Sequence, residues 1–258
     1  MRYSRILALV AAVCVAAGML DAQSASPTPP KPKSKKEVDA LRAMYAAQTP
    51  DDQIAKAKGF IDAFADSEFR SSAFYVMAAA SDAKRDSVNV VVYGEQAVAL
   101  DPLNFGSMAL MSKAIAQGTK KFDLDKADKL ARADKLAKDA LEISQKAPKP
   151  KADLTDEQWS AAVKEFVEPA YEGLAYESLA KDDFAGCAQN FDLAVASLSQ
   201  LEPALLIRSG HCSLLAKKYD DAIASFDKAI NSPNSVEVIK RIATQEKAQA
   251  VQAKAAQK

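Results

Sequence analysis

Residues 202–233 read EPALLIRSGHCSLLAKKYDDAIASFDKAINSP and predict two short amphipathic helices joined by a tight turn. Apolar residues recur at spacings of three and four on both sides of the turn, as they do when one face of a helix is buried. The turn reads KKYDD, and its two aspartates favour the positive N-terminal end of the second helix. This stretch therefore predicts a helical hairpin.

The same pattern occurs one unit earlier in the chain. Four residues recur after 35 positions: Phe184, Cys187, Phe191 and Ala194 correspond to Tyr219, Ala222, Phe226 and Ala229. A fixed period of this size is typical of stacked supersecondary units, because one hairpin cannot bury its apolar face alone. Small residues are expected where the paired helices approach closely, at Ala175, Cys187, Gly210 and Ala222. The sequence therefore predicts an all-α fold of stacked helix pairs.

The two units resemble those of the tetratricopeptide repeat (TPR) family. The residues that carry the resemblance are Tyr171, Leu174, Ala175, Phe184, Cys187, Phe191 and Ala194 in one unit, and Gly210, Tyr219, Ala222, Phe226, Ala229 and Pro233 in the next. The likeness extends loosely over residues 70–258, where YGEQAVALDPLN resembles the end of an earlier unit. The resemblance implies a right-handed superhelix of stacked antiparallel helix pairs, a TPR-like α-solenoid, in which the first helix of each pair lines a concave groove.

We divide the chain into a signal peptide at 1–22, a linker rich in proline and lysine at 23–36, and a TPR-like helical repeat domain at 37–258. The domain is expected to hold about five helix pairs and a C-terminal helix, because the links between periodic segments are short. The strand-like run VNVVVY is followed by residues with helical spacing, so we predict helix there. Pro169 falls inside a helical pattern and is expected to kink or divide it.

The N-terminal segment has the residue order of a secretory signal. Arg2 and Arg5 precede an apolar run from Ile6 to Leu20, and the small residue Ala22 offers a cleavage site. The apolar run is short for a membrane span, and an uncleaved membrane anchor is the alternative. We therefore expect a periplasmic or secreted protein, and this segment could bring it close to a membrane.

Two cysteines, Cys187 and Cys212, lie on neighbouring predicted helices of the repeat domain. An extracytoplasmic compartment permits a disulfide between them. We expect instead two small buried thiols at tight helix contacts, with the disulfide as the alternative.

No residue pattern in the sequence indicates catalysis. His211 is the sole histidine, without a second one for a metal site and without a Gly-rich nucleophile turn. The run FDLDKADK lacks the glycine and terminal glutamate of a calcium loop, and no phosphate-binding loop, dinucleotide fingerprint or CxxC is present. With 34 basic and 34 acidic residues, no global field favours nucleic acid. We expect a protein that is not an enzyme, takes no cofactor or metal, and does not bind nucleic acid.

The resemblance also predicts which residues line the groove. The fifth and ninth positions of the first helices hold Tyr75 and Ala79, Glu172 and Tyr176, and Ile207 and His211, with Arg208 alongside. Tyrosine and arginine are frequent anchors for a protein partner, although these residues could instead only cover the repeat. We therefore expect an extracytoplasmic scaffold that binds a protein or peptide in the repeat groove. The alternative is a carrier of a small ligand or lipid in the superhelix interior, and the sequence leaves partner and oligomeric state open.

Overall fold

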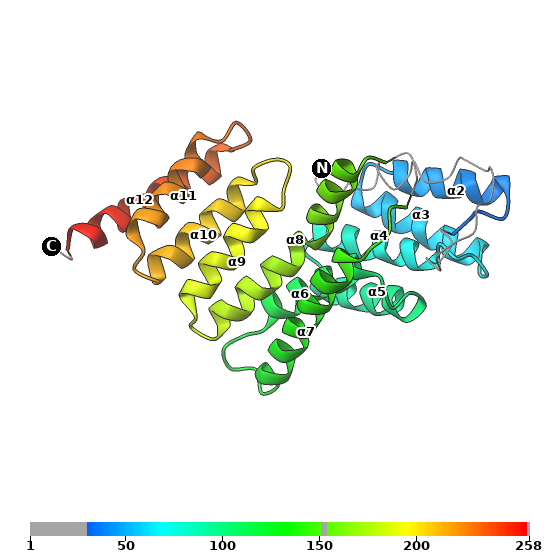
Figure 1. Cartoon of the computed structure of the whole chain (residues 1–258), viewed down its shortest axis with the longest axis horizontal. Helices are drawn as coiled ribbons and strands as arrows, with labels where there is room; N and C mark the ends of the chain where they lie inside the picture. Colours follow the sequence, from blue (N-terminus) through cyan, green and yellow to red (C-terminus); the bar gives the residue numbers. More distant parts are fainter. Residues whose placement is uncertain (1–29, 151–153, 257–258) are drawn as a thin grey trace.

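The computed structural model describes residues 30–150 and 154–256. Over these residues the chain forms eleven helices and no strand (Figure 1). In chain order they are α2 (Lys35–Ala46), α3 (Pro50–Ala63), α4 (Arg70–Ala83), α5 (Ser87–Leu100), α6 (Phe105–Gly118), α7 (Lys126–Gln145), α8 (Asp156–Ala180), α9 (Phe184–Ala196), α10 (Pro203–Leu215), α11 (Tyr219–Asn231) and α12 (Glu237–Ala255). The predicted signal peptide and the first half of the predicted linker, residues 23–29, lie outside the described residues.

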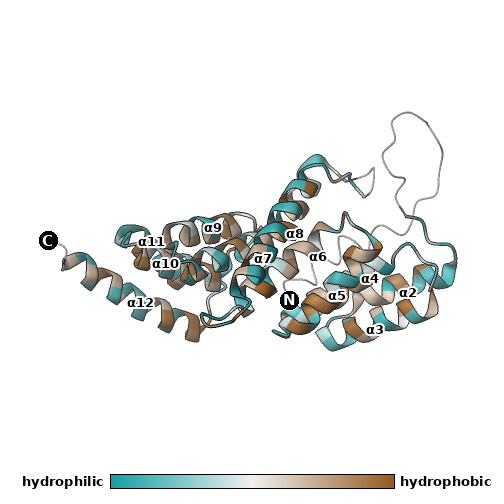
Figure 2. Cartoon of the chain, turned by 90° about the horizontal axis from the view of Figure 1, so that it is seen from below, coloured by the Kyte–Doolittle hydropathy of each residue, from teal (hydrophilic) through white to brown (hydrophobic). Residues whose placement is uncertain are grey.

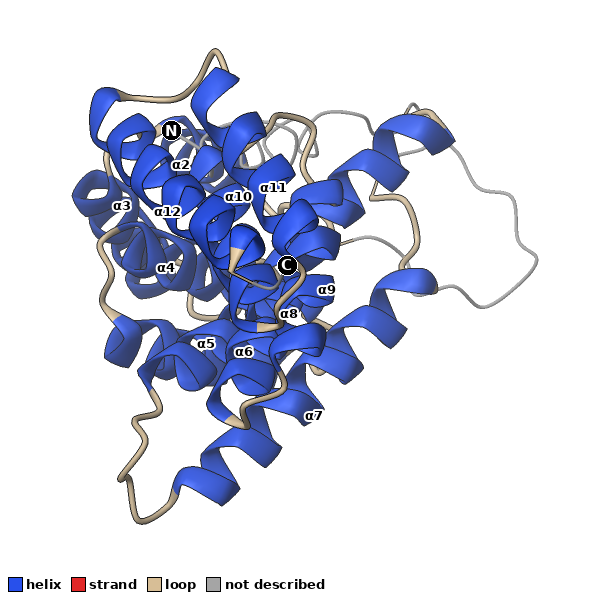
Figure 3. Ribbon diagram, turned by 90° about the vertical axis from the view of Figure 1, so that its left-hand side faces the viewer, coloured by secondary structure: helices blue, strands red, loops and turns tan. Residues whose placement is uncertain are grey.

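Consecutive helices form hairpins that stack from α2 at one end of the molecule to α12 at the other (Figure 1). Figure 3 looks along this stack from the α12 end and shows the described elements as helices joined by loops. We call α2, α4, α6, α8, α10 and α12 the first-helix row, and α3, α5, α7, α9 and α11 the second-helix row. Within the first-helix row, α4 contacts α6, α6 contacts α8, and α10 contacts α12. The predicted all-α solenoid of stacked helix pairs is confirmed, and the run VNVVVY lies inside α5 as helix.

Three hairpins close with the same backbone turn. Arg85, Asp182 and Lys217 each have a φ near 60°, in the left-handed region. The amide N–H of the next residue then donates to a serine carbonyl at 2.9 Å: Asp86 to Ser81, Asp183 to Ser178, and Lys218 to Ser213. This geometry satisfies a free carbonyl in the last turn of the first helix. The shared turn marks α4–α5, α8–α9 and α10–α11 as equivalent units.

The hairpins are held together by small residues packed against aromatic rings. Ala175, Cys187 and Ala222 are fully buried, as predicted. Gly210 faces the ring of Phe226, where an added Cβ would lie 2.6 Å from a ring carbon. Helix amphipathicity is visible in Figure 2, where hydrophilic and hydrophobic residues alternate around most helices. The predicted roles of these small positions are therefore confirmed.

Helix α8 is the longest helix that the structure describes, and it begins with a capping box formed by Thr155 and Gln158. Pro169 was expected to kink or divide this helix, and the helix is not divided, because α8 continues through Pro169 from Asp156 to Ala180. Pro169 removes one backbone hydrogen bond, and its neighbour Ala170 is buried in a core cluster with residues of α6 and α7. In the described parts of the chain, no helix combines the length and apolar character needed to cross a membrane.

Gly173 lets α8 approach α6 at backbone distance. A Cβ at this position would lie 3.0 Å from the backbone nitrogen of Lys113 and would collide with Ser112 Oγ. The Ser112 hydroxyl cannot swing away freely, because it donates to the carbonyl of Ala133 at 2.8 Å. Alanine at position 173 therefore forces the two helices apart.

We expect Gly173→Ala to lower the free energy of unfolding by about 1–3 kcal/mol, as overpacking does in close-packed cores. Gly59→Ala in α3 is the matched control, since a Cβ there meets nothing within 4 Å. That variant should gain about 0.5–1 kcal/mol from helix propensity. Urea denaturation followed by circular dichroism measures the free energy of unfolding of both variants. An equal change in that free energy for Gly173→Ala and Gly59→Ala would show that the α6–α8 contact can relax.

Candidate functional site: a charged row on the first helices

A chain of ion pairs crosses four helices of the first-helix row. Lys113 of α6 lies 3.0 Å from Asp82 of α4 and 3.1 Å from Glu172 of α8. The other oxygen of Glu172 accepts a hydrogen bond of 2.7 Å from Arg208 of α10. We call Asp82, Lys113, Glu172 and Arg208 the charged row.

Lys113 is the most enclosed cation of this row, with a side chain only 11% exposed. Burial alone would lower its pKa, but the carboxylates of Glu172, Asp82 and Glu168 outweigh burial and raise that pKa above its usual range. Lys113 therefore remains an ammonium ion at neutral pH. A lysine held in this form cannot act as a nucleophile or general base, so its role here is electrostatic.

Arg208 projects from the row toward solvent. Its partner Glu172 is fully buried, whereas the Arg208 side chain is 39% exposed. The guanidinium lies 5.7 Å from the centre of the Tyr176 ring, and that ring packs edge-on against Phe191 at 5.3 Å. Gln117 donates a hydrogen bond to the Tyr176 hydroxyl at 3.1 Å. Burial raises the pKa of Tyr176, which favours its neutral phenol. Arg208 is thus held by an anion on one side and an aromatic ring on another.

His211 extends the arrangement along α10 toward α12. Its Nδ1 lies 3.1 Å from Glu246 Oε2, and its side chain is about half exposed. Ile207, by contrast, packs partly buried against the core cluster of α10, α11 and α12. The structure therefore places His211 on the open surface and Ile207 in the packing beneath it.

Tyr75 lies in a different part of the molecule from the other predicted groove residues. It lines an aromatic pocket between α4, α6 and the N-terminal half of α8, and burial raises the pKa of its phenol. The structure thus brings Glu172, Tyr176 and Arg208 together, sets His211 one helical turn beyond Ile207, and separates Tyr75 from them.

The sequence reasoning missed Lys113, Asp82 and Glu168. Lys113 is the only charged residue in α6, which reads FGSMALMSKAIAQG. A lone charge inside an otherwise buried helix requires a buried partner of opposite charge, because lysine is almost never fully buried unpaired. The sequence therefore indicated that Lys113 has a buried acidic partner, but it did not identify which carboxylates pair with it.

The expectation of two free thiols at Cys187 and Cys212 is wrong. The two residues form a disulfide that joins α9 to α10, with their Cα atoms 5.7 Å apart. Both residues are buried. The hairpin α8–α9 is therefore linked to the next hairpin covalently by this disulfide and electrostatically by Glu172 and Arg208.

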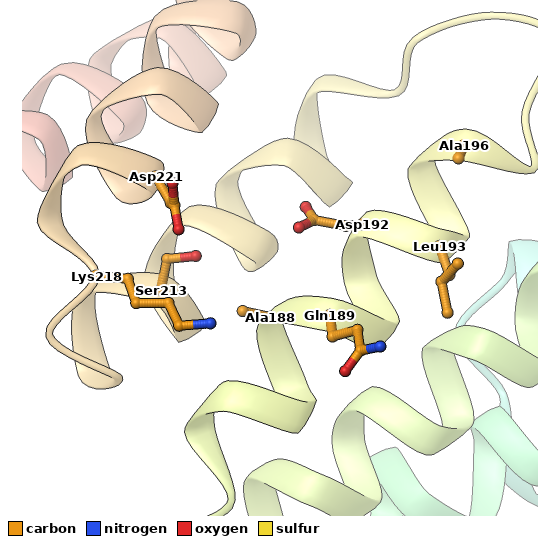
Figure 4. A pocket seen from close by; sticks show the side chains of 8 residues that line it. All are labelled: Ala188, Gln189, Asp192, Leu193, Ala196, Ser213, Lys218 and Asp221. Atoms are coloured by element: carbon orange, nitrogen blue, oxygen red, sulfur yellow. The ribbon is translucent and has the colours of Figure 1, made fainter.

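A hollow of about 460 Å³ lies outside the charged row, between α9 and the α10–α11 hairpin (Figure 4). Asp221, Lys218 and Ser213 stand on one side of it, and the α9 side chains stand on the other (Figure 4). Among the described residues, no group of three or more His, Cys, Asp or Glu side chains is arranged to hold a metal ion.

Comparison with known proteins supports the fold alone. The chain resembles the solved structure of a thermophilic TPR protein in Thermus thermophilus, with a TM-score of 0.58 and 15% sequence identity. The match covers 81% of this chain and 98% of that one. No protein-family model matches the sequence, and no curated protein matches it significantly. The chain therefore has a TPR-like helical-repeat fold.

Proposed function

We propose that this protein is a non-catalytic, extracytoplasmic scaffold that binds a protein or peptide along its first-helix row. The observation that carries the proposal is the half-exposed Arg208 held between buried Glu172 and the Tyr176 ring. A side chain held in this way loses little conformational entropy when a partner binds. Arginine and tyrosine are also the residue types that most often dominate the binding energy of an interface.

The exposed groups around Arg208 suggest what the partner presents. Gln117 and His211 lie on the same row and are also exposed. Together with the guanidinium they offer hydrogen-bond donors, which suit the carbonyl or carboxylate oxygens of a peptide. Helical-repeat proteins use extended surfaces of this kind for protein partners.

Two features support an extracytoplasmic location. Residues 1–22 have the order of a secretory signal. The Cys187–Cys212 disulfide is the kind of bond that persists in oxidising compartments and is rare in the cytosol. Together they favour a periplasmic or secreted protein.

The test begins with a photo-crosslinking residue at position 211, on the first-helix row, in cells that make the full chain. Position 189, exposed on α9 of the second-helix row, is the control. A partner specific to the first-helix row is captured from position 211 and not from position 189. Equal capture from both positions, or none, contradicts the proposal.

Arg208→Ala is then expected to weaken binding of the purified partner by about 30-fold, the effect of losing a central arginine anchor. Arg208→Lys should retain part of the affinity, because it keeps the charge but not the planar group. Arg132→Ala is the matched control, because Arg132 forms an exposed pair with Glu95 in the second-helix row. Isothermal titration calorimetry measures all three, and equal affinity for Arg208→Ala and Arg132→Ala would remove Arg208 from the interface.

The alternative function is a carrier of a small ligand or lipid. One observation favours it: the pocket around Tyr75 is lined mostly by aromatic and apolar side chains and has a volume of about 270 Å³. Pockets that bind small molecules have this composition. The hollow in Figure 4 is lined by Asp192, Asp221 and Lys218 and is a poorer match to an apolar ligand.

A further inference from the structure

The aromatic pocket gathers five of the rings in this chain around one space. Its volume is about 270 Å³. Its lining residues come from α2, α4, α6 and α8 and from the segments between helices: Tyr45, Ser72, Tyr75, Asp101, Leu103, Asn104, Phe105, Gly106, Pro150, Trp159 and Phe166. Aromatic residues make up only 7% of the sequence, and the single tryptophan is among those that line the pocket.

The rings form walls in several planes. Phe166 of α8 lies 5.8 Å from Tyr75, with 58° between the ring planes. It also lies 6.0 Å from Phe105, at 88°. Mutually inclined rings can present faces and edges to one enclosed group from more than one side.

Backbone and hydrogen-bond contacts hold these walls in place. Trp159 Nε1 donates to the carbonyl of Ala147 at 3.0 Å, which fixes the indole. Gly106 allows the Tyr75 ring to lie against α6, because a Cβ there would be 2.9 Å from a carbon of that ring. The pocket is therefore built before any ligand arrives.

Among the described residues that line the pocket, Asp101 alone carries a charge. One of its carboxylate oxygens accepts the N–H of Leu103 at 3.0 Å, and its side chain is exposed. Aromatic faces and one carboxylate together attract a monocation. Aromatic rings dominate the lining, and two of its acceptor oxygens are already engaged: one of Asp101 by the N–H of Leu103, and that of the Asn104 side chain by the N–H of Ser107. A cation with several donors of its own would therefore lose hydration without full replacement. A quaternary ammonium group has no donors and avoids that loss.

We propose that this pocket binds a quaternary ammonium group, either of a free solute or of a lipid headgroup. The inference goes beyond the scaffold proposal and does not depend on it, because the pocket and the Arg208 surface share no residue. Tyr75, Phe105, Trp159 and Phe166 form the walls, and Asp101 provides the counter-charge.

The single tryptophan makes the test direct, since Trp159 fluorescence reports on the pocket alone. The purified full chain is titrated with choline chloride and, separately, with 3,3-dimethylbutanol, the neutral analogue of the same shape, at constant ionic strength. A saturable change with choline at a dissociation constant of about 1 mM or lower is expected, with binding of the neutral analogue at least about tenfold weaker. Equal binding of both compounds, or no saturation with choline, overturns the proposal.

Phe166→Leu removes one aromatic wall while keeping apolar volume, and Asp101→Asn removes the charge while keeping the acceptor for Leu103. Each is expected to weaken choline binding by about three- to tenfold. Phe122→Leu is the control, because Phe122 is 88% exposed on the α6–α7 link and does not line the pocket. Circular dichroism checks that each variant is folded, and an unchanged affinity in both folded pocket variants contradicts the assignment.

Phosphatidylcholine vesicles separate the two sources of the ligand, with phosphatidylglycerol vesicles as the reference. A Trp159 response to phosphatidylcholine only, together with choline binding, identifies a lipid headgroup. Choline binding without a vesicle response identifies a free solute. A response to both vesicle types without choline binding indicates non-specific membrane adsorption and overturns the proposal.

Discussion

Replacing Lys113 with methionine is expected to lower the free energy of unfolding by about 3–5 kcal/mol, the usual effect of removing one member of a buried ion pair. The substitution leaves Asp82 and Glu172 without their shared cation, and Glu172 is fully buried. Methionine fills a similar volume, so the loss reports on charge rather than on a cavity. Urea denaturation of the variant and the parent, followed by circular dichroism, measures the difference.

The control for this prediction is an exposed ion pair of similar geometry. Arg132 and Glu95 lie 2.6 Å apart with side chains 48% and 53% exposed, so Arg132→Met should change stability by less than about 1 kcal/mol. The double variant Lys113→Met/Glu172→Met should be less destabilised than the sum of the single variants, because the fully buried Glu172 carboxylate is then no longer left facing a missing cation. Equal effects of Lys113→Met and Arg132→Met would show that solvent reaches the charged row and compensates for the loss.

Most of the fold was predictable because the repeat depends on residue size. Gly210 and Ala222 had to be small where helices meet, and Phe226 had to fill the space beside them. These positions recur at fixed spacing, so the sequence alone identifies a stacked hairpin. Whether Pro169 divides its helix was not predictable, because the helix-breaking tendency of proline depends on packing, and packing is not visible in a single sequence.

The candidate site was less predictable than the fold. Arg208, Tyr176 and Glu172 were identified from their positions in the repeat, and the structure places them in contact. Lys113 was missed, because its partners lie 31 residues before it and 59 residues after it along the chain, on α4 and α8. Which carboxylates meet a buried lysine depends on the angle between successive hairpins, and local periodicity carries no information about that angle.

The pairing of the two cysteines was also not predictable, although they are closer together in the sequence than Lys113 and its partners. Cys187 and Cys212 are separated by 25 residues, and sequence places them only on neighbouring helices. A disulfide requires Cα atoms within about 7 Å and side chains that point toward each other. Small buried thiols satisfy the same sequence pattern, so only the three-dimensional arrangement distinguishes the two.

The double variant Cys187→Ala/Cys212→Ala is expected to lower the free energy of unfolding by about 3–4 kcal/mol, the chain-entropy effect of opening a loop of this length. Replacing both residues avoids leaving an unpaired thiol. Wild-type protein reduced before unfolding separates the cross-link from packing, because it loses the bond but keeps both sulfur atoms. Trapping free thiols before lysis should leave both cysteines unlabelled until a reductant is added, and labelling without reductant contradicts an oxidised bond in the cell.

The form of the unfolding curve tests what the disulfide does within the stack. Stability in a solenoid is approximately a sum of unit stabilities and of contacts between neighbouring units. The disulfide and the Glu172–Arg208 pair both join the α8–α9 unit to α10. Opening the disulfide should therefore uncouple α10–α12, so that this part unfolds at lower urea concentration than the rest. Hydrogen exchange resolves the two parts, and uniform loss of protection along the chain would instead show that the remaining contacts keep the stack cooperative.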